Sequence, residues 1–295
     1  MTPLDYDFLR HALKQRSGLV LSADKHYFLE SRLLPLARRK GFAGVGDLVL
    51  ALKTGGDSAL MAAVAEAMTT NESFFFRDKT PFEHFRQIIM PALLEARRQS
   101  RAIRIWCAAA ASGQEPYSIA MCLREMTSAV AGWRIEILAT DLADAVLDRA
   151  RQGLYSQFEV QRGLPIKLLV RYFTQVGDSW QIAPEIRAMV NFRCFNLLSD
   201  FASLGTFDVV LCRNVLIYFD QETKSDVLRR MAEAMSSDAY LVLGAAETAV
   251  GLSDRFRTVS DRPGLYEINA PKVHLMAQDR RMHGRPRLIA ISGGR

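Results

Sequence analysis

The spacing of apolar residues changes about a third of the way along the chain, and this change limits the possible folds. From residue 5 to about 95, apolar residues recur every three or four positions, as in Leu29, Leu33 and Leu36. This spacing is typical of amphipathic helices, and no alternating strand pattern interrupts it. The sequence therefore predicts an all-helical N-terminal domain.

One helix of this domain has clear end signals. Asp24 stands at the position of an N-cap, and Gly41 follows a basic last turn. These residues predict a helix over 25–40. Pro35 lies inside it and predicts a kink or a break.

After Arg101, short strand-like runs alternate with helical stretches. The runs cover 103–107, 135–139, 190–195, 207–212 and 239–243, and helical stretches lie near 115–130, 143–152 and 221–236. Such alternation predicts a doubly wound α/β domain, in which helices cover both faces of a parallel sheet. Two further short runs, 256–259 and 264–268, are expected to close the sheet edge as a hairpin.

A second hairpin signal interrupts this order. Residues 172–176 and 179–182 flank Gly177-Asp178, which predicts a small inserted β-hairpin subdomain near 172–182. In total we expect a helical domain over 1–80, an α/β domain over 81–270 and a disordered basic tail over 271–295.

The positive charge is unevenly distributed. The chain carries a net charge of +6, yet residues 10–40 alone carry +6 and residues 271–295 carry +5. A basic helix face and tail around a mildly acidic body suit an acidic protein partner or a nucleic acid. A solvated helix face and a free tail explain the same charges equally well.

Several classes of protein are disfavoured. No apolar run approaches the roughly 20 residues of a membrane-spanning helix, and the N-terminus does not resemble a secretion signal. A cytoplasmic location is therefore expected. The chain has no Cys-x-x-Cys pair and no His-Glu-x-x-His motif, so no metal site is expected. It also lacks a P-loop and a nucleophile-elbow motif.

Two loops after predicted strands carry the candidate chemistry, because ligands of open α/β sheets bind at the carboxyl ends of the strands. The first loop, 108–116, has small residues but no G-x-G-x-x-G motif. Its Glu115 would repel a pyrophosphate and attract a cationic amino group. Asp141, after the second strand, could bind ribose hydroxyls or could cap the helix near Ala143. A nucleoside with an amino group describes S-adenosylmethionine better than NAD.

Five ordered motifs closely resemble the CheR family of chemotaxis receptor methyltransferases. They are MTTNESFFFRD at 68–78, SGQEPYSIAM at 112–121, ATD at 139–141, FNLL at 195–198 and CRNVLIYFD at 212–220. The resemblance extends from residue 5 to about 269. It implies a Rossmann-like domain that transfers the methyl group of S-adenosylmethionine to glutamate side chains on the cytoplasmic helices of methyl-accepting chemotaxis receptors.

The resemblance also implies roles for individual residues. The family's cofactor contacts fall on Asn71, Ser73, Arg77, Glu115, Asp141, Asn196, Leu197, Arg213 and Asn214. Ser73 replaces a threonine found in many relatives and keeps a hydroxyl. Ala110 and Ala111 replace residues with polar side chains, so a side-chain contact from that loop is in doubt.

Two residues are candidates for the reacting centre. Arg77 could bind a carboxylate of the substrate or cofactor through its guanidinium fork. Tyr218 could direct its hydroxyl at the reacting atoms, or it could make a buried structural hydrogen bond.

The basic helix supplies the expected partner surface. Arg32, Arg38 and Arg39 are predicted to dock on acidic receptor helices, and the protein is expected to act as a monomer that neither binds nucleic acid nor inserts into a membrane. A nucleic-acid methyltransferase is one alternative, although 214–218 lacks the [DN]-P-P-[YF] turn common in enzymes that methylate base amino groups. The other is a cofactor-sensing module without activity.

Overall fold

The computed structural model describes residues 1–22, 24–55 and 57–269. The tail expected to be disordered, 271–295, lies outside the described residues. Within them, no helix is long and apolar enough to cross a membrane.

Four helices form the N-terminal domain: α1 (Pro3–Ser17), α2 (His26–Arg39), α3 (Val45–Gly55) and α4 (Ser58–Met68). The ends of α1 follow from its sequence. The Thr2 hydroxyl oxygen accepts the Asp5 N–H, and the Asp5 carboxylate accepts the Thr2 N–H. Gly18 ends the helix with φ 76°. The apolar faces of the helices meet in one core that includes Leu9, Leu29 and Val64.

Helix α2 differs from its prediction at its start and in its middle. Its N-cap is Lys25, without a side-chain bond, because the Asp24 carboxylate accepts the Ser22 hydroxyl instead. The helix continues through Pro35 without a break. Its C-terminus agrees with the prediction, since Gly41 adopts φ 83° and the next N–H, from Phe42, bonds to the Ala37 carbonyl.

The larger domain is built on a seven-stranded sheet in the order β6-β2-β1-β7-β8-β10-β9. The strands are β1 (Ala102–Ala108), β2 (Arg134–Asp141), β6 (Val190–Cys194), β7 (Phe207–Cys212), β8 (Met235–Leu243), β9 (Phe256–Thr258) and β10 (Leu265–Ile268). The first five strands in sequence pair in parallel, whereas β9 and β10 form an antiparallel hairpin at the edge. The predicted doubly wound fold is confirmed.

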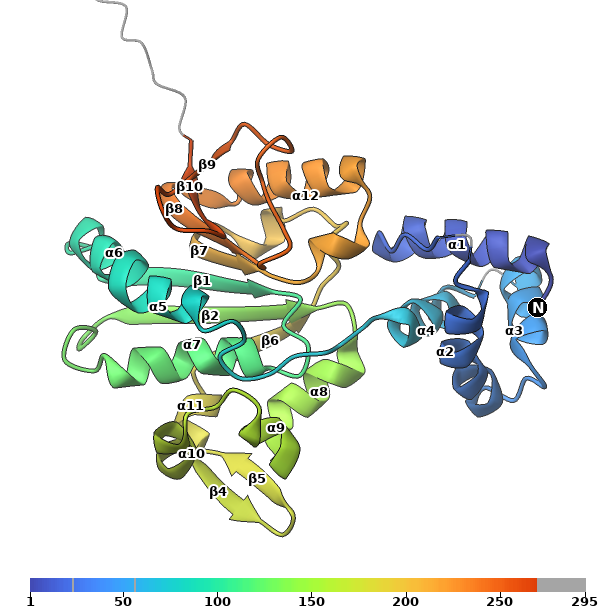
Figure 1. Ribbon diagram of the computed structural model, residues 1–295, viewed down its shortest axis with the longest axis horizontal. Coiled ribbons are helices and arrows are strands. Elements are labelled where there is room, and N and C mark those ends of the chain that lie inside the picture. Colours follow the sequence, from blue (N-terminus) through green and yellow to red (C-terminus); the bar gives the residue numbers. More distant parts are fainter. Residues whose placement is uncertain (23, 56, 270–295) are drawn as a thin grey trace, which may run out of the picture.

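Helices cover both faces of this sheet. Ile105 and Cys107 of β1 pack in one core cluster with α7 (Gln114–Glu125), whereas Trp106 and Ala108 pack in another with α12 (Gln221–Glu233). Alternate residues of a strand point to opposite faces, so a strand covered on both sides reads as a continuous apolar run. Figure 1 shows the helical domain beyond the carboxyl ends of β1 and β2.

The remaining helices connect or cover these elements. They are α5 (Thr80–His84), the π-helical turn η1 (Phe85–Ile89), α6 (Met90–Ala96), α8 (Asp144–Gln152), α9 (Gln157–Gln161), α10 (Ile166–Tyr172), α11 (Pro184–Arg187) and the 3₁₀ turns η2 (Ala202–Leu204) and η3 (Leu216–Tyr218).

The inserted subdomain holds one more strand than predicted. The hairpin of β4 (Phe173–Val176) and β5 (Ser179–Ile182) is present, but β3 (Leu154–Ser156) pairs with the other side of β5. The order is β3-β5-β4, and Figure 1 shows the hairpin projecting below the main sheet. Three residues are too few for an alternating pattern, so β3 is recognisable only through its pairing.

The chain passes from the core of the helical domain to the core of the α/β domain before residue 80, where the boundary between the domains was expected. Met68 is the last residue in the core of the helical domain. Phe75 is fully buried in the core of the α/β domain, where its ring contacts Tyr155 and Phe173 edge-on. The change from one core to the other therefore falls within 69–74.

The packing around Phe75 generates a stability prediction. Gly163 has φ 86°, and a Cβ there would lie 2.2 Å from the Phe75 carbonyl oxygen. Gly251 has φ 75° with open space around it. We expect Gly251→Ala to lower the free energy of unfolding by roughly 1 kcal/mol through its left-handed backbone, and Gly163→Ala to lower it by about 2 kcal/mol more because backbone must move.

Urea unfolding followed by tryptophan fluorescence would measure this difference, because all three tryptophans lie in the larger domain. Equal losses for the two variants would contradict the close packing of Gly163 on Phe75.

Candidate functional site

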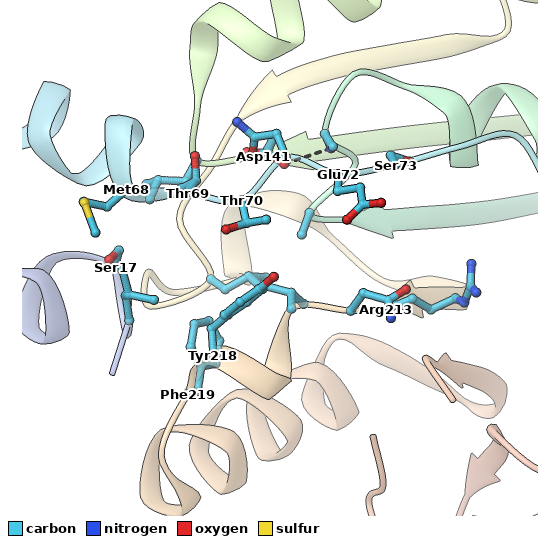
Figure 2. Close-up of a pocket in the computed structure, with 18 of the residues that line it drawn as sticks. Ser17, Met68, Thr69, Thr70, Glu72, Ser73, Asp141, Arg213, Tyr218 and Phe219 are labelled. Carbon is cyan, nitrogen blue, oxygen red and sulfur yellow. Dashed lines mark hydrogen bonds between the residues drawn. The ribbon is translucent and has the colours of Figure 1, made fainter. Parts of the chain in front are cut away.

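A cavity of about 480 Å³ lies at the carboxyl ends of the strands, between the two domains. This size falls within the range of small-molecule sites. All ten residues predicted to bind cofactor or act at the reacting centre line it: Asn71, Ser73, Arg77, Glu115, Asp141, Asn196, Leu197, Arg213, Asn214 and Tyr218. Figure 2 shows Asp141 and Tyr218 on opposite sides of this space. The structure thus brings together five motifs that are far apart in sequence.

The loop after β1 turns sharply beside the cavity. Ala109, Ala111 and Gly113 adopt φ values of 57°, 47° and 90°. Left-handed alanines are strained, so other contacts must hold them. The Ala110 N–H bonds to the Thr140 carbonyl at 2.9 Å, and the Ala111 N–H bonds to Asp141 Oδ2 at 2.9 Å. The loops after β1 and β2 therefore support each other.

Asp141 is buried and holds both of these loops. Its Oδ1 accepts the Ala143 N–H at 3.0 Å, while Oδ2 accepts the Ala111 N–H. Burial raises the pKa of its carboxyl above the ordinary value, and the backbone N–H bonds oppose this rise. Helix α8 begins at Asp144 with Ala143 as its N-cap, so Asp141 is not the helix cap. Each carboxylate oxygen has further lone pairs for a ligand.

A buried guanidinium crosses the floor of the site. The Arg213 side chain is 2% exposed, and its Nη1 donates to Glu115 Oε2 at 2.7 Å. Its Nη2 donates to Asp78 Oδ2 at 2.6 Å and to the Arg77 carbonyl at 3.0 Å. Burial raises the pKa of Glu115, the pairing with Arg213 lowers it, and Glu247 raises it further, so the net direction is upward.

The linker between α4 and α5 carries three of the predicted residues: Asn71, Ser73 and Arg77. The Phe76 N–H bonds to the Ser118 hydroxyl of α7 at 3.0 Å, which fixes the linker against the sheet domain. Arg77 Nη1 donates to the Glu72 carbonyl at 2.9 Å, and its guanidinium stacks on the Phe74 ring. These contacts leave other guanidinium N–H groups for a carboxylate ligand.

The helical domain forms a wall of the cavity, which sequence reasoning missed. Its contributions come mainly from the connection between α1 and α2 and from the start of α2: Ser17, Leu19, Val20, Leu21, Ser22, Lys25 and Phe28. Backbone hydrogen bonding joins Val20 N–H to the Tyr218 carbonyl at 2.9 Å. Lys14 pairs with Asp220 at 2.6 Å. No periodicity in the sequence signals such contacts.

Asn196 is already engaged by this wall. Its Nδ2 donates to the Arg16 carbonyl at 2.7 Å, and its Oδ1 accepts the Leu198 N–H at 2.9 Å. The side chain therefore fixes α1 against the site as well as lining the cavity.

The predicted docking arginines lie outside the cavity. Arg32, Arg38 and Arg39 are exposed on α2. The Arg32 guanidinium lies 5.3 Å from the ring centre of Phe28, which does line the cavity. Arg32 thus lies near the edge of the site, whereas Arg38 and Arg39 lie in the last turn of α2.

Comparisons with known proteins agree with this architecture. Residues 4–69 match the family model "CheR methyltransferase, all-alpha domain", and residues 71–265 match "CheR methyltransferase, SAM binding domain". The chain is 42% identical over 267 residues to chemotaxis protein methyltransferase 1 of Pseudomonas aeruginosa, covering 88% of this chain and 96% of that protein.

A second relative gives the same result. Chemotaxis protein methyltransferase Cher2 of Pseudomonas putida is 40% identical over 266 residues, covering 89% of this chain and 96% of that protein. S-adenosylmethionine is the cofactor, as predicted. Both domain models and nearly the whole length of the relatives are matched, and the chain belongs to the CheR family of chemotaxis methyltransferases.

Proposed function

We propose that the protein transfers the methyl group of S-adenosylmethionine to glutamate side chains on the cytoplasmic helices of methyl-accepting chemotaxis receptors. The products are glutamyl methyl esters and S-adenosylhomocysteine. The observation that carries this proposal is the position of the cavity, which has the predicted cofactor residues on one side and the basic helix α2 at its edge. A long acidic helix can approach such an edge without entering the sheet domain.

The donor and acceptor groups around the cavity fit the cofactor. Asp141 offers carboxylate lone pairs to ribose hydroxyls, and Glu115 offers an anionic partner to the ammonium group. Arg77 suits the carboxylate of the methionine part. The other predicted contacts, Asn71, Ser73, Asn196, Leu197, Arg213 and Asn214, surround these three. When bound, the cofactor supplies an electrophilic methyl group on a sulfonium centre.

The protein's chemical task is mainly to orient the substrate. A glutamate carboxylate is ionised at neutral pH, so its methylation needs no general base. Tyr218 lines the cavity, and its hydroxyl makes no hydrogen bond to another described residue. This favours a role at the reacting centre over a structural bond. The hydrogen bond from the Val20 N–H to the Tyr218 carbonyl holds this residue against the helical domain, which supports a fixed orientation at the reacting centre.

The proposal is tested by offering different substrates to the purified protein. We expect labelled methyl groups to appear on receptor cytoplasmic fragments as base-labile esters, and not on RNA. Labelling of RNA would indicate a nucleic-acid methyltransferase. Cofactor binding without labelling of either substrate would indicate a sensing module.

The raised pKa of Glu115 generates a pH prediction. The pKa of the Glu115 carboxyl lies above its ordinary value of 4.5, so the carboxylate begins to be protonated above pH 4.5. Affinity for the cationic cofactor should therefore fall as the pH is lowered through this range. Glu115→Gln should bind about tenfold more weakly at neutral pH and show a smaller pH dependence, with the remainder due to Asp141.

Calorimetric titration between pH 5 and 8 would measure both effects. Glu95→Gln, at an exposed position, is the matched control and should behave as wild type. An unchanged pH dependence in Glu115→Gln would contradict the assigned role.

The docking surface generates a second prediction. Charge reversal of Arg32, Arg38 and Arg39 to Glu should slow receptor methylation at least several-fold at low ionic strength, and the effect should shrink as salt screens the charges. Cofactor affinity should not change, because none of the three lines the cavity.

A matched triple reversal is available at Arg98, Arg124 and Arg134. These exposed residues lie just after α6, in the last turn of α7 and at the start of β2, at the ends remote from the cavity. Initial methylation rates would decide. Equal slowing by both triple variants would remove the docking role from α2.

The inserted subdomain generates a third prediction. Only Gly177-Asp178 separates β4 from β5, which leaves little backbone to hold a receptor tail peptide beside the hairpin. We expect methylation to be independent of such a tail and no binding of a labelled C-terminal receptor pentapeptide at near-millimolar concentration. Fluorescence anisotropy would measure it, with a scrambled peptide as control. Micromolar, sequence-specific binding through the free edge of β4 would overturn this prediction.

A further inference from the structure

Glu247 lies in the loop after β8 and does not line the cavity. Its carboxylate accepts backbone N–H groups from two separate segments. Oε2 accepts the N–H groups of Asn214 and Gly244, both at 2.8 Å. Oε1 accepts those of Val215, Leu216 and Ile217, at 2.9, 2.8 and 3.4 Å.

These contacts answer a local problem in the backbone. Asn214 adopts φ 59° as the chain turns from β7 into η3. The turn directs successive N–H groups to one point, which forms a concave anion-binding arrangement. The first N–H groups of a helical turn have no intrahelical partner, so those at the start of η3 need an acceptor from elsewhere. The Glu247 carboxylate supplies that acceptor from within the chain.

Gly244 brings the second segment close enough. A Cβ at Gly244 would lie 2.7 Å from Glu247 Oε2 and 3.0 Å from both the backbone nitrogen and the Nδ2 of Asn214. A side chain at Gly244 would therefore crowd this carboxylate and Asn214. The loops after β7 and β8 are joined through the Glu247 carboxylate, which accepts N–H groups from both.

The turn that Glu247 holds carries residues of the site. Asn214 at the start of the turn and Tyr218 at its end both line the cavity. The Tyr218 carbonyl accepts a hydrogen bond from the Val20 N–H of the helical domain. A shift of the turn would therefore move a predicted cofactor contact, the candidate residue of the reacting centre and the contact between the domains together.

We propose that Glu247 is a positioning residue, which holds the 214–218 turn in the geometry that binds the cofactor and aims Tyr218. The expected effect on cofactor binding requires only that the chain binds S-adenosylmethionine, the cofactor of its family. The effect on Tyr218 rests on the proposed function. Because the carboxylate acts through hydrogen-bond geometry, both its length and its two oxygens are required.

Two substitutions test this requirement. Glu247→Gln keeps the shape but places an NH₂ group opposite N–H donors, and Glu247→Asp keeps the charge but withdraws it from the turn. Both should raise the Kd of S-adenosylmethionine and of S-adenosylhomocysteine by about tenfold. Calorimetric titration well below the melting temperature of each variant gives these values and does not depend on finding a substrate.

The control is Asp57→Ala, which removes the N-cap of α4 remote from the turn. It should lower the melting temperature and leave both Kd values unchanged. If Glu247→Gln does not fold, Glu247→Asp decides alone. Unchanged Kd values in a folded variant would overturn the proposal. It would also be overturned if Glu247→Gln weakened the binding of S-adenosylmethionine alone and Glu247→Asp bound it as wild type does, because Glu247 would then act through its charge and not through hydrogen-bond geometry. Failure of wild type to methylate receptor fragments would count only against the proposed function.

Discussion

The buried guanidinium of Arg213 joins three parts of the chain that the site needs together. It follows β7, pairs with Glu115 of α7 and reaches Asp78 and the Arg77 carbonyl of the linker. A buried cation that lost one of these partners would cost about 3–5 kcal/mol. The linker, which carries Asn71, Ser73 and Arg77, is therefore held to the sheet domain by electrostatics as well as by the burial of Phe75.

Two buried carboxylates lie on the sheet side of the cavity, one of them paired with Arg213. Glu115 and Asp141 line it, and Glu247 lies close enough to raise the pKa of Glu115. Burial of both lining carboxylates makes their charged forms costly in the empty protein, and a cationic ligand relieves that cost.

Much of the fold was predictable because it follows from local patterns. The strand runs at 103–107 and 207–212 are apolar except for Arg104 and Asp208, because helices cover both faces of the sheet. The C-terminal hairpin follows its turn residues. The short strand β3 and the N-terminus of α2 were not predictable, because pairing with β5 and a Ser22–Asp24 contact decide them. The change of core near Phe75 likewise depends on packing with Tyr155, far away in sequence.

The candidate site divides in the same way. Asp141 and Glu115 could be found from their places after strands, and the motif resemblance supplied the other lining residues that were predicted. Glu247 and the wall formed by the α1–α2 connection could not. Glu247 acts through backbone N–H groups, which leave no trace in residue type, and Val20 contributes its main chain to Tyr218. Sequence motifs identify side chains, whereas these contacts are made by backbone.

The contacts of the helical domain join the basic helix α2 to the edge of the site. Helix α2, which carries the basic face, is joined to α1 by the connection that holds Val20 against Tyr218. Lys14–Asp220 and Asn196–Arg16 fix α1 to the same edge of the sheet domain. The elements that carry α2 are therefore the same ones that line the cavity on this side. Apolar packing adds to these polar links, since Leu142 of the larger domain packs on the core of the helical domain. A displacement of α2 would therefore also move residues that line the cavity.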